Sequence, residues 1–479
     1  MLVYLTFDNS ARRIRMMRFG FLTLVVTMLI AGAGNRNHAA AQDDAELVQV
    51  VVELLGDKDK DIRALGLEQV RTQAKGEAAT KLFAAQLPKL PADAQVGLLS
   101  ALADRGDRAA RPAVVELLGA SKDEAVRVAA IAALGPLGKT DDATLLVGLL
   151  KSDAKPEAAA ARKSLVRLAD DGVGASISAQ MKAAEPALRV ALIEVLVARR
   201  EKAAVGDLLA AAVDENEKVR AAAMAALGEL ASAEHVGGMV QGVLAATSNA
   251  ERAAAEKAVM FVCERIADPD KRAEPLIAAM EGLKPEDRDA MLSTLGRIGG
   301  AAALARIEAA ISDTDAKQRD VGIRAICNWP DASIAARILE LATKAETPEQ
   351  RTMALRALIR VAPLADKRTD KERLELLAKA MKMAQRDDER KLVLQRSRAV
   401  RTVESLRYVL PYVDDAKLSE TAAESVVELA HHRALRDANK EEFHRALDKV
   451  IAKSKDAVVV DRAKRYKRGE TWVRPKPSG

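Results

Sequence analysis

The sequence feature that most limits the fold of this chain is an internal repeat with a period of about 32 residues. The phrase Val-Arg-x-x-Ala-x-x-Ala-Leu-Gly begins at Val126 and recurs at Val219. The arginine of this phrase aligns with positions 63, 95, 127, 158, 189, 220, 252, 288, 319, 351, 390 and 422, at even spacing except for longer steps after 252 and 351. Nine of these twelve positions are arginine, whereas Gln95, Ala158 and Ala422 occupy the other three. A period this short predicts one array of repeats instead of several independent domains.

Each copy has the pattern of two short helices. Apolar residues follow the arginine at helical spacing, as Ile131 and Leu134 do after Arg127. A second apolar stretch precedes each copy, for example residues 143–150. The composition agrees, because 49% of the 479 residues are hydrophobic but only 3% are aromatic, and alanine favours helices over strands.

A single helical hairpin cannot bury its own apolar face, so neighbouring hairpins must stack. The sequence therefore predicts an all-α protein, an α-solenoid of about 12–13 two-helix repeats over residues 42–468. The thirteenth pair is degenerate and is expected at 441–467, and residues 469–479 form a basic tail. The two longer steps accommodate residues 268–272 and 363–371, which we expect to be surface loops.

The repeated phrase resembles that of HEAT-repeat proteins, and within them it is similar to the short repeats of phycobilisome-lyase type. This resemblance implies that the second helix of each repeat lines a concave face. It also implies that each arginine packs against an acidic residue of the turn or of the adjacent repeat, for which Asp61, Glu124 and Glu217 are the candidates. We interpret the arginine column as a structural ladder that holds the register of the repeats. Its members are Arg63, Arg127, Arg189, Arg220, Arg252, Arg288, Arg319, Arg351 and Arg390.

Residues 1–41 have the pattern of a secretory signal peptide. Four arginines between Arg12 and Arg18 precede an apolar run over residues 19–33, and small residues follow as far as Ala41. We expect export to the periplasm or the medium, with cleavage before Gln42. The apolar run is shorter than the roughly 20 residues that span a membrane, although an uncleaved anchor stays an alternative. Translation is expected to start at Met1, Met16 or Met17.

The charge of the chain is unevenly distributed. Removing residues 1–41 takes away five arginines and Asp8, so the net charge falls from +6 to +2. Residues 42–300 then carry a balance of −7, and residues 301–479 a balance of +9. Arginines on the predicted second helices of the last third suggest a basic groove that would attract anionic partners. The residues of this candidate partner-binding set are Arg324, Arg356, Arg360, Arg396, Arg398 and Arg401. A solvated face with balanced charges is the alternative.

No motif in the sequence favours catalysis or a bound metal. Asp57, Asp59, Asp61 and Glu68 match the outer frame of a calcium loop, but Ile62 occupies the place of its required glycine. His431 and His432 are adjacent on a predicted helix and point in different directions, and His444 lies on the next one. Cys263 and Cys327 lie two repeats apart, about 20 Å, which is too far for a disulfide. We expect two buried thiols and no metal and no cofactor.

One enzyme is raised by the resemblance to short HEAT repeats, namely deoxyhypusine hydroxylase. Its iron site uses His-Glu pairs, whereas this chain has only the reverse order, at Glu234 and His235. That activity is therefore not carried over. The sequence also has no phosphate-binding loop and no nucleophile elbow, so we expect a chain that is not an enzyme.

Three functions are consistent with these observations. The first is an exported scaffold or adaptor that binds a protein through its concave face. The second is a binding module for an anionic envelope or extracellular polymer through the basic groove. The third, carried by the resemblance alone, is a lyase-like or chaperone activity toward a tetrapyrrole. Binding to nucleic acid is not expected, because aromatic stacking platforms are missing. The exposed first repeat, residues 43–56, favours a monomer without a stable membrane span after cleavage.

Overall fold

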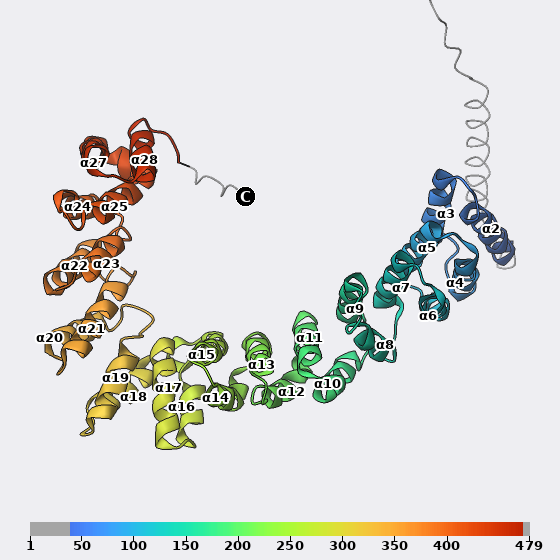
Figure 1. Cartoon of the computed structure of the whole chain (residues 1–479), viewed down its shortest axis with the longest axis horizontal. Coiled ribbons are helices and arrows are strands. Elements are labelled where there is room, and N and C mark those ends of the chain that lie inside the picture. The colour runs from blue at the N-terminus through green and yellow to red at the C-terminus, as the bar shows by residue number, and fades with distance from the viewer. Residues whose placement is uncertain (1–38, 473–479) are drawn as a thin grey trace, which may run out of the picture. The chain divides into compact units, whose positions relative to one another are not determined.

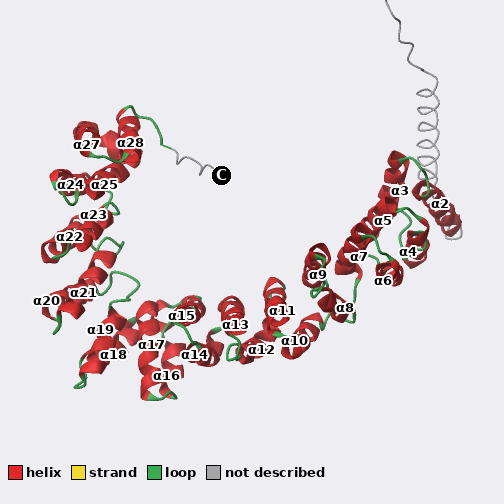
Figure 2. Cartoon of the chain, viewed as in Figure 1, coloured by secondary structure: helices red, strands yellow, loops and turns green. Residues whose placement is uncertain are grey.

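The computed structural model describes residues 39–472, with side chains from residue 47 onward. In that range the chain forms 27 α-helices and six short 3₁₀ helices, and it forms no strand (Figure 2). The expected all-α class is therefore confirmed. The expected signal peptide lies outside the described residues apart from its last three residues, which begin the first described helix, α2 (Ala39–Leu55).

The chain divides into two compact units, of which the first ends at Ala211. Within it, first and second helices alternate, and each second helix packs against the second helix of the next repeat (Figure 1). The second helices are α3 (Lys60–Thr72), α5 (Ala92–Arg105), α7 (Glu124–Leu137), α9 (Lys155–Arg167) and α11 (Pro186–Ala198). The first helices, after α2, are α4 (Glu77–Ala84), α6 (Arg111–Ala120), α8 (Asp142–Leu149), α10 (Val173–Ala183) and α12 (Val205–Ala211).

The C-terminal unit begins at Ala212 and repeats the same arrangement. Its second helices are α13 (Glu217–Leu230), α15 (Asn249–Glu264), α17 (Pro285–Ile298), α19 (Ala316–Ile326), α21 (Pro348–Val361), α23 (Asp387–Ser397), α25 (Ser419–His431) and α28 (Ala457–Lys467). Its first helices are α14 (Val236–Ala245), α16 (Glu274–Glu281), α18 (Ala301–Ile311), α20 (Ala335–Lys344), α22 (Asp370–Met383), α24 (Val403–Val409) and α27 (Lys440–Lys453), and the short α26 (Arg433–Ala438) precedes α27. Within this unit the second helices from α13 to α25 line the inner side of its curve (Figure 1).

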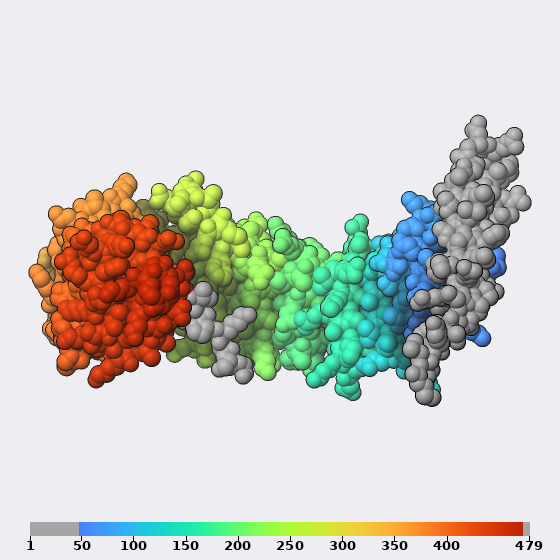
Figure 3. All heavy atoms as spheres, turned by 90° about the horizontal axis from the view of Figure 1, so that it is seen from above, coloured from blue at the N-terminus to red at the C-terminus, as the bar shows by residue number. Residues whose placement is uncertain are grey.

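The register expected from the sequence is confirmed throughout the array. In all twelve copies the aligned position is the fourth residue of the second helix, as Arg127 is in α7 and Arg220 is in α13. The degenerate thirteenth pair is α27 and α28, which begins one residue earlier than expected. The apolar positions four and seven residues after the arginine are buried, for example Ile131 and Leu134. Side chains fill the space between neighbouring helices, so that each unit has a continuous surface (Figure 3).

The glycine of the repeated phrase lies where consecutive second helices approach most closely. A Cβ atom on Gly296 would overlap the carbonyl oxygen of Ala325 on α19. On Gly228 it would lie 3.2 Å from the Cβ of Ala258 on α15. Gly228 and Gly296 are therefore needed in their own repeats, because atoms of the next second helix occupy the space of a side chain.

The two insertions form connections between helices. Residues 269–271 of the first insertion form a 3₁₀ turn, and the Asp268 side chain accepts a hydrogen bond from the N–H of Asp270. In the second insertion, the Thr369 side chain caps α22 by accepting a hydrogen bond from the N–H of Glu372. The last two residues of this insertion, 370 and 371, are therefore helical where a loop was expected, because Thr369 and Glu372 form a capping box there.

Candidate partner-binding groove

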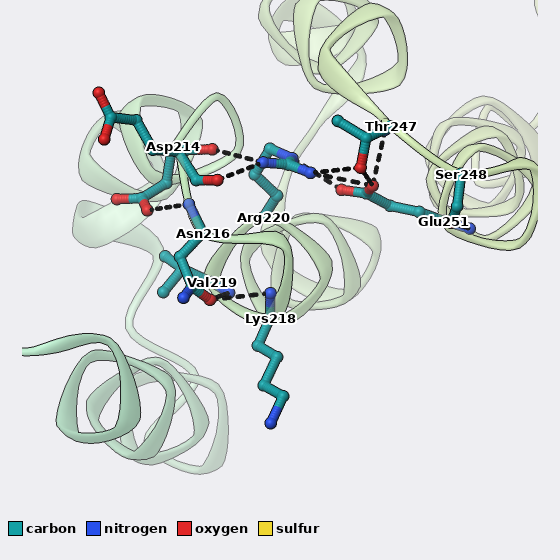
Figure 4. A network of polar contacts seen from close by, with 9 residues as sticks. Asp214, Asn216, Lys218, Val219, Arg220, Thr247, Ser248 and Glu251 are labelled. Atoms are coloured by element: carbon teal, nitrogen blue, oxygen red, sulfur yellow. Dashed lines mark hydrogen bonds and ion pairs between the residues drawn. The ribbon is translucent and has the colours of Figure 1, made fainter.

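The ladder arginines hold the two helices of their own repeat together. Arg220 donates from Nη1 to the carbonyl oxygens of Asp214, at 2.8 Å, and Glu215, at 2.9 Å, in the turn before α13 (Figure 4). Arg63 donates in the same way to the carbonyls of Asp57 and Lys58. Further ladder members that donate to the turn or helix end before them are Arg127, Arg189, Arg288, Arg319, Arg351 and Arg390. These carbonyls lie at or near the C-terminus of the first helix, which carries partial negative charge, so the positive charge of the arginine also stabilises that helix.

Some ladder arginines also reach forward to the next repeat. Arg220 makes a two-point ion pair with Glu251, with Nε to Oε1 at 2.7 Å and Nη2 to Oε2 at 3.0 Å (Figure 4). Both side chains are almost fully buried, and the hydrogen bond from Arg220 lowers the pKa of Glu251 below its ordinary value. Arg127 pairs with Glu157 in the same two-point manner.

The acidic partners expected for the ladder are therefore wrong. Arg63 pairs with Asp93 at 2.8 Å, not with Asp61, because Asp61 lies on the first turn of α3 beside the arginine and not opposite it. Likewise Arg127 pairs with Glu157 and not with Glu124, and Arg220 pairs with Glu251 and not with Glu217. Glu157 and Glu251 lie in the first turns of α9 and α15. An acidic side chain in the first turn also stabilises its own helix, because the N-terminus of a helix carries partial positive charge.

The ladder is not uniform, since the side chain of Arg252 has no hydrogen bond or ion pair within residues 47–472. It lies half-buried on α15, where its charge acts to lower the pKa of Glu256 against the larger effect of burial.

A second set of arginines, which the sequence analysis did not single out as a group, closes the opposite end of the second helices. Arg199 donates to the carbonyls of Leu165, at 2.6 Å, and Leu168, at 2.7 Å, at the end of α9. Arg105, Arg265 and Arg360 do the same for α3, α13 and α19. We call these four residues the capping arginines. Each caps the second helix of the repeat before its own.

Three members of the candidate set expected from the sequence, Arg324, Arg356 and Arg360, meet around one open hollow of about 470 Å³ on α19 and α21. We call this the arginine hollow. Its other lining residues are Ser293, Cys327, Asn328, Met353 and Ala357. Met353 and Ala357 supply apolar surface, and the Asn328 amide donates to Ser293 Oγ at 3.2 Å.

Two arginines of the hollow form ion pairs with carboxylates. Arg324 pairs with Asp320 one turn earlier on α19, at 2.6 Å. Arg356 pairs with Asp388 of the next repeat, at 2.8 Å, and its Nε lies 4.0 Å from Oε1 of the buried Glu389. Side chains of both pairs are exposed, Arg324 by 60% and Asp388 by 58%, so these ion pairs stabilise the fold little.

Arg360 differs from these two because it is half-buried. Its Nη2 donates to the carbonyls of Trp329, at 2.7 Å, and Cys327, at 3.1 Å. Burial lowers the pKa of Arg360, and the like charge of Arg396 adds to this effect.

The other three arginines of the candidate set lie apart from the hollow lining. Arg398 pairs with Glu424 on α25 at 3.0 Å. Arg396 and Arg401 are exposed, and neither side chain has a hydrogen bond or ion pair within residues 47–472. The structure thus brings together half of the set. Asp320 and Glu424, which neutralise part of it, were missed because they reach the arginines from one turn or one repeat away.

The residues that the sequence analysis weighed as metal ligands or reactive thiols lie in ordinary structural surroundings. No group of three or more His, Cys, Asp or Glu side chains in residues 47–472 could hold a metal ion. Asp59, from the calcium-like pattern, is the N-cap of α3 and accepts from the N–H of Asp61. Cys263 and Cys327 are free and buried, and burial raises the pKa of each thiol to about 12. His431 is hydrogen-bonded to the Tyr466 hydroxyl at 2.8 Å.

No helix within the described part of the chain meets the length and hydropathy of a membrane span.

Comparison with known proteins agrees with the helical repeats. Residues 79–166 match the family model for HEAT repeats, whereas no curated protein sequence matches the chain. Solved structures of similar fold include the karyopherin Kap121p bound to the extreme C-terminus of the protein phosphatase Cdc14p, at 11% identity and a TM-score of 0.46. That match covers 94% of this chain and 57% of the karyopherin, so this chain spans little more than half of its length.

Two smaller structures are also similar. Human deoxyhypusine hydroxylase in complex with glycerol matches at 20% identity and a TM-score of 0.25, over 60% of this chain and 98% of that one. The complex of CpcE and CpcF of phycocyanin lyase from Nostoc matches at 17% identity and a TM-score of 0.26, over 49% and 94%. Identities this low bring no activity over to this chain. The resemblance to HEAT-repeat proteins is confirmed by the family match, and the chain is an all-α solenoid that contains HEAT repeats at residues 79–166.

Proposed function

We propose that this chain is an exported, non-enzymatic scaffold that binds a partner protein along the second helices of its C-terminal unit. The observation that carries the proposal is the arginine hollow on α19 and α21, where guanidinium groups adjoin the apolar side chains of Met353 and Ala357. Arginine and methionine are enriched in protein interfaces, and stacked helical repeats present extended surfaces of this kind. The HEAT repeats at residues 79–166 support the same function.

The export part of the proposal depends on the amino terminus of the sequence. The basic segment, the apolar run and the small residues before Gln42 have the order of a secretory signal peptide. The partner would then be an envelope or secreted protein.

Binding to an anionic polymer receives less support from the contacts of the candidate arginines. A polymer is held by a row of uncompensated cations, whereas Arg324, Arg356 and Arg398 each have a carboxylate partner. Arg396 and Arg401 are left as exposed cations. A tetrapyrrole-directed activity receives no support from any contact of the described residues.

The test is a cross-linked pull-down from the exporting cell with the protein comprising residues 42–479. Its comparison protein carries Arg324→Gln and Arg356→Gln, and its control carries Arg306→Gln, an exposed arginine on the first helix α18. We expect one protein to be captured by the parent and the control and to be depleted with the double variant. Equal capture by all three would overturn the proposed face, and capture of no protein by any of them would overturn the scaffold function.

A further inference from the structure

Arg360 is the one capping arginine, among the four in the described chain, that is half-buried without an acidic group to compensate its charge. Arg105 and Arg199 are also partly buried, but the charges of Asp107 and Glu201, respectively, stabilise their cations. Arg265 is exposed to solvent. Arg360 instead experiences the like charge of Arg396, and no carboxylate forms an ion pair with it within residues 47–472.

A desolvated cation of this kind favours a bound anion. Burial removes the water that would otherwise stabilise the guanidinium, and no side chain of the described chain replaces that water with negative charge. The hydrogen bonds of Arg360 to Cys327 and Trp329 both come from Nη2. Nε and Nη1 therefore remain free to donate, and each can give a single charge-assisted hydrogen bond to a carboxylate oxygen.

The surroundings of Arg360 fit a peptide better than a free ion. The arginine hollow of about 470 Å³ has the volume of a small ligand site, enough for a few side chains but not for a folded domain. Arg324 and Arg356 lie in its lining with Met353 and Ala357. A segment that carries both a carboxylate and an apolar side chain would satisfy both kinds of surface.

The present partners of Arg324 and Arg356 do not prevent such binding. Asp320 and Asp388 lie in exposed ion pairs, which typically contribute about 0–1 kcal/mol because water screens them. A carboxylate that enters the hollow can therefore take over a guanidinium donor while the aspartate returns to solvent.

We propose that the arginine hollow binds an acidic segment of the partner protein, with an Asp or Glu carboxylate paired to Arg360 and a neighbouring apolar side chain against Met353 and Ala357. This inference rests on the proposed function and specifies the chemistry of the partner. An anionic polysaccharide would supply carboxylates without the apolar side chain, so the two classes are distinguishable in the test.

The test is fluorescence anisotropy with a fluorescein-labelled peptide that alternates glutamate with leucine, added to the protein comprising residues 42–479. Arg360→Gln is expected to weaken binding on the order of tenfold, since it removes a charge-assisted hydrogen bond. Arg265→Gln is the matched control, because it removes a guanidinium with the same capping role at a place outside the hollow. Arg356→Gln, whose side chain caps no helix, repeats the test without loss of a cap and should also weaken binding.

The outcomes separate this inference from the proposed function. Loss of peptide binding with Arg360→Gln and Arg356→Gln but not with Arg265→Gln supports the acidic segment. Equal affinity for all proteins, or tighter binding of polygalacturonate than of the peptide, overturns it. If the peptide does not bind while the cellular partner still cross-links to the parent protein, the acidic segment is wrong and the scaffold function stands. If neither the peptide nor a cellular partner binds, both the acidic segment and the scaffold function are wrong.

Discussion

At the scale of single residues, the arginine column is a two-sided connector. Arg220 donates to carbonyls of the turn before its own helix and pairs with Glu251 on the next second helix. One side chain thus fixes the angle between two helices of one repeat and the register of the next repeat. Both partners of the pair are buried, so removal of one leaves an uncompensated charge on the other.

The replacement Arg220→Ala should therefore lower the free energy of unfolding by about 3–5 kcal/mol. Arg252→Ala, at the same position of the next repeat, has no hydrogen bond to lose within the described chain and should cost less than about 1 kcal/mol. Urea denaturation of the two variants measures the difference. Equal losses would show that the ladder acts through packing of the arginine stem and not through its ion pair.

Acid should weaken the same contact. The hydrogen bond from Arg220 lowers the folded-state pKa of Glu251 below its ordinary value of 4.5. The stability gained from this pair is therefore fully present above pH 4.5 and is lost as the pH falls through the lowered pKa. We expect Glu251→Gln to lower stability at neutral pH and to reduce the further loss on acidification, as measured by urea midpoints across that range. The control Glu281→Gln, which removes an exposed carboxylate on α16, should keep the parent's acid dependence. If Glu251→Gln and the parent lose stability in parallel, the pair does not titrate with folding.

The sequence predicts the position of each ladder arginine but not its acidic partner. The position follows from a periodicity that any alignment of the copies reveals. The partner lies 31 residues away for Glu251, and adjacent acidic residues such as Glu217 compete for the assignment. Only the stacking of α13 on α15 decides between them.

At the scale of helices, glycine at the end of the repeated phrase permits a close approach of neighbouring second helices in the copies that carry it. Gly296 on α17 leaves no space for a Cβ beside Ala325 of α19, and Gly135 and Gly228 occupy the corresponding place in earlier repeats. Glycine normally weakens a helix by about 0.5–1 kcal/mol relative to alanine. The close approach of consecutive backbones offsets that cost through tighter packing.

Replacing Gly296 with alanine should therefore destabilise the chain by about 1–3 kcal/mol, because α17 and α19 must separate. Gly237→Ala on α14 is the control, since nothing lies within 4 Å of a Cβ built there. It should be neutral or should stabilise by up to about 1 kcal/mol. Thermal unfolding of both variants checks the prediction, and a more stable Gly296→Ala protein would contradict the close approach.

The helix boundaries could be predicted from the sequence, whereas most of the contacts between helix ends could not. Turn residues and caps mark the start of each second helix, and all twelve aligned positions fall on its fourth residue. The capping arginines were not grouped, because the carbonyls they reach belong to the preceding repeat. Arg360 was expected to line a groove, which it does, but its bonds to Cys327 and Trp329 depend on where α19 ends.

At the scale of the whole molecule, each of the two units is an array in which every repeat contacts mainly its neighbours along the chain. Such an architecture suits the binding of an extended partner more than the enclosure of a small substrate. The expected export determines where that partner would be found.

Export itself predicts a defined amino terminus. The protein recovered from the envelope or the medium should begin at Gln42, as determined by mass spectrometry of its first peptide. A chain that keeps residues 1–41 in the membrane fraction would support the uncleaved anchor, and recovery of the intact chain only from the cytoplasm would contradict export.

The central claim, that a partner protein binds in the arginine hollow, is tested most directly by photo-cross-linking in the exporting cell. A photoreactive amino acid replaces Met353, in the hollow, or Arg306, which is exposed on the first helix α18. We predict that one protein is captured from position 353 and not from position 306, and that Arg360→Gln removes this capture. Capture of the same protein from both positions, or capture at 353 that persists with Arg360→Gln, would contradict the account.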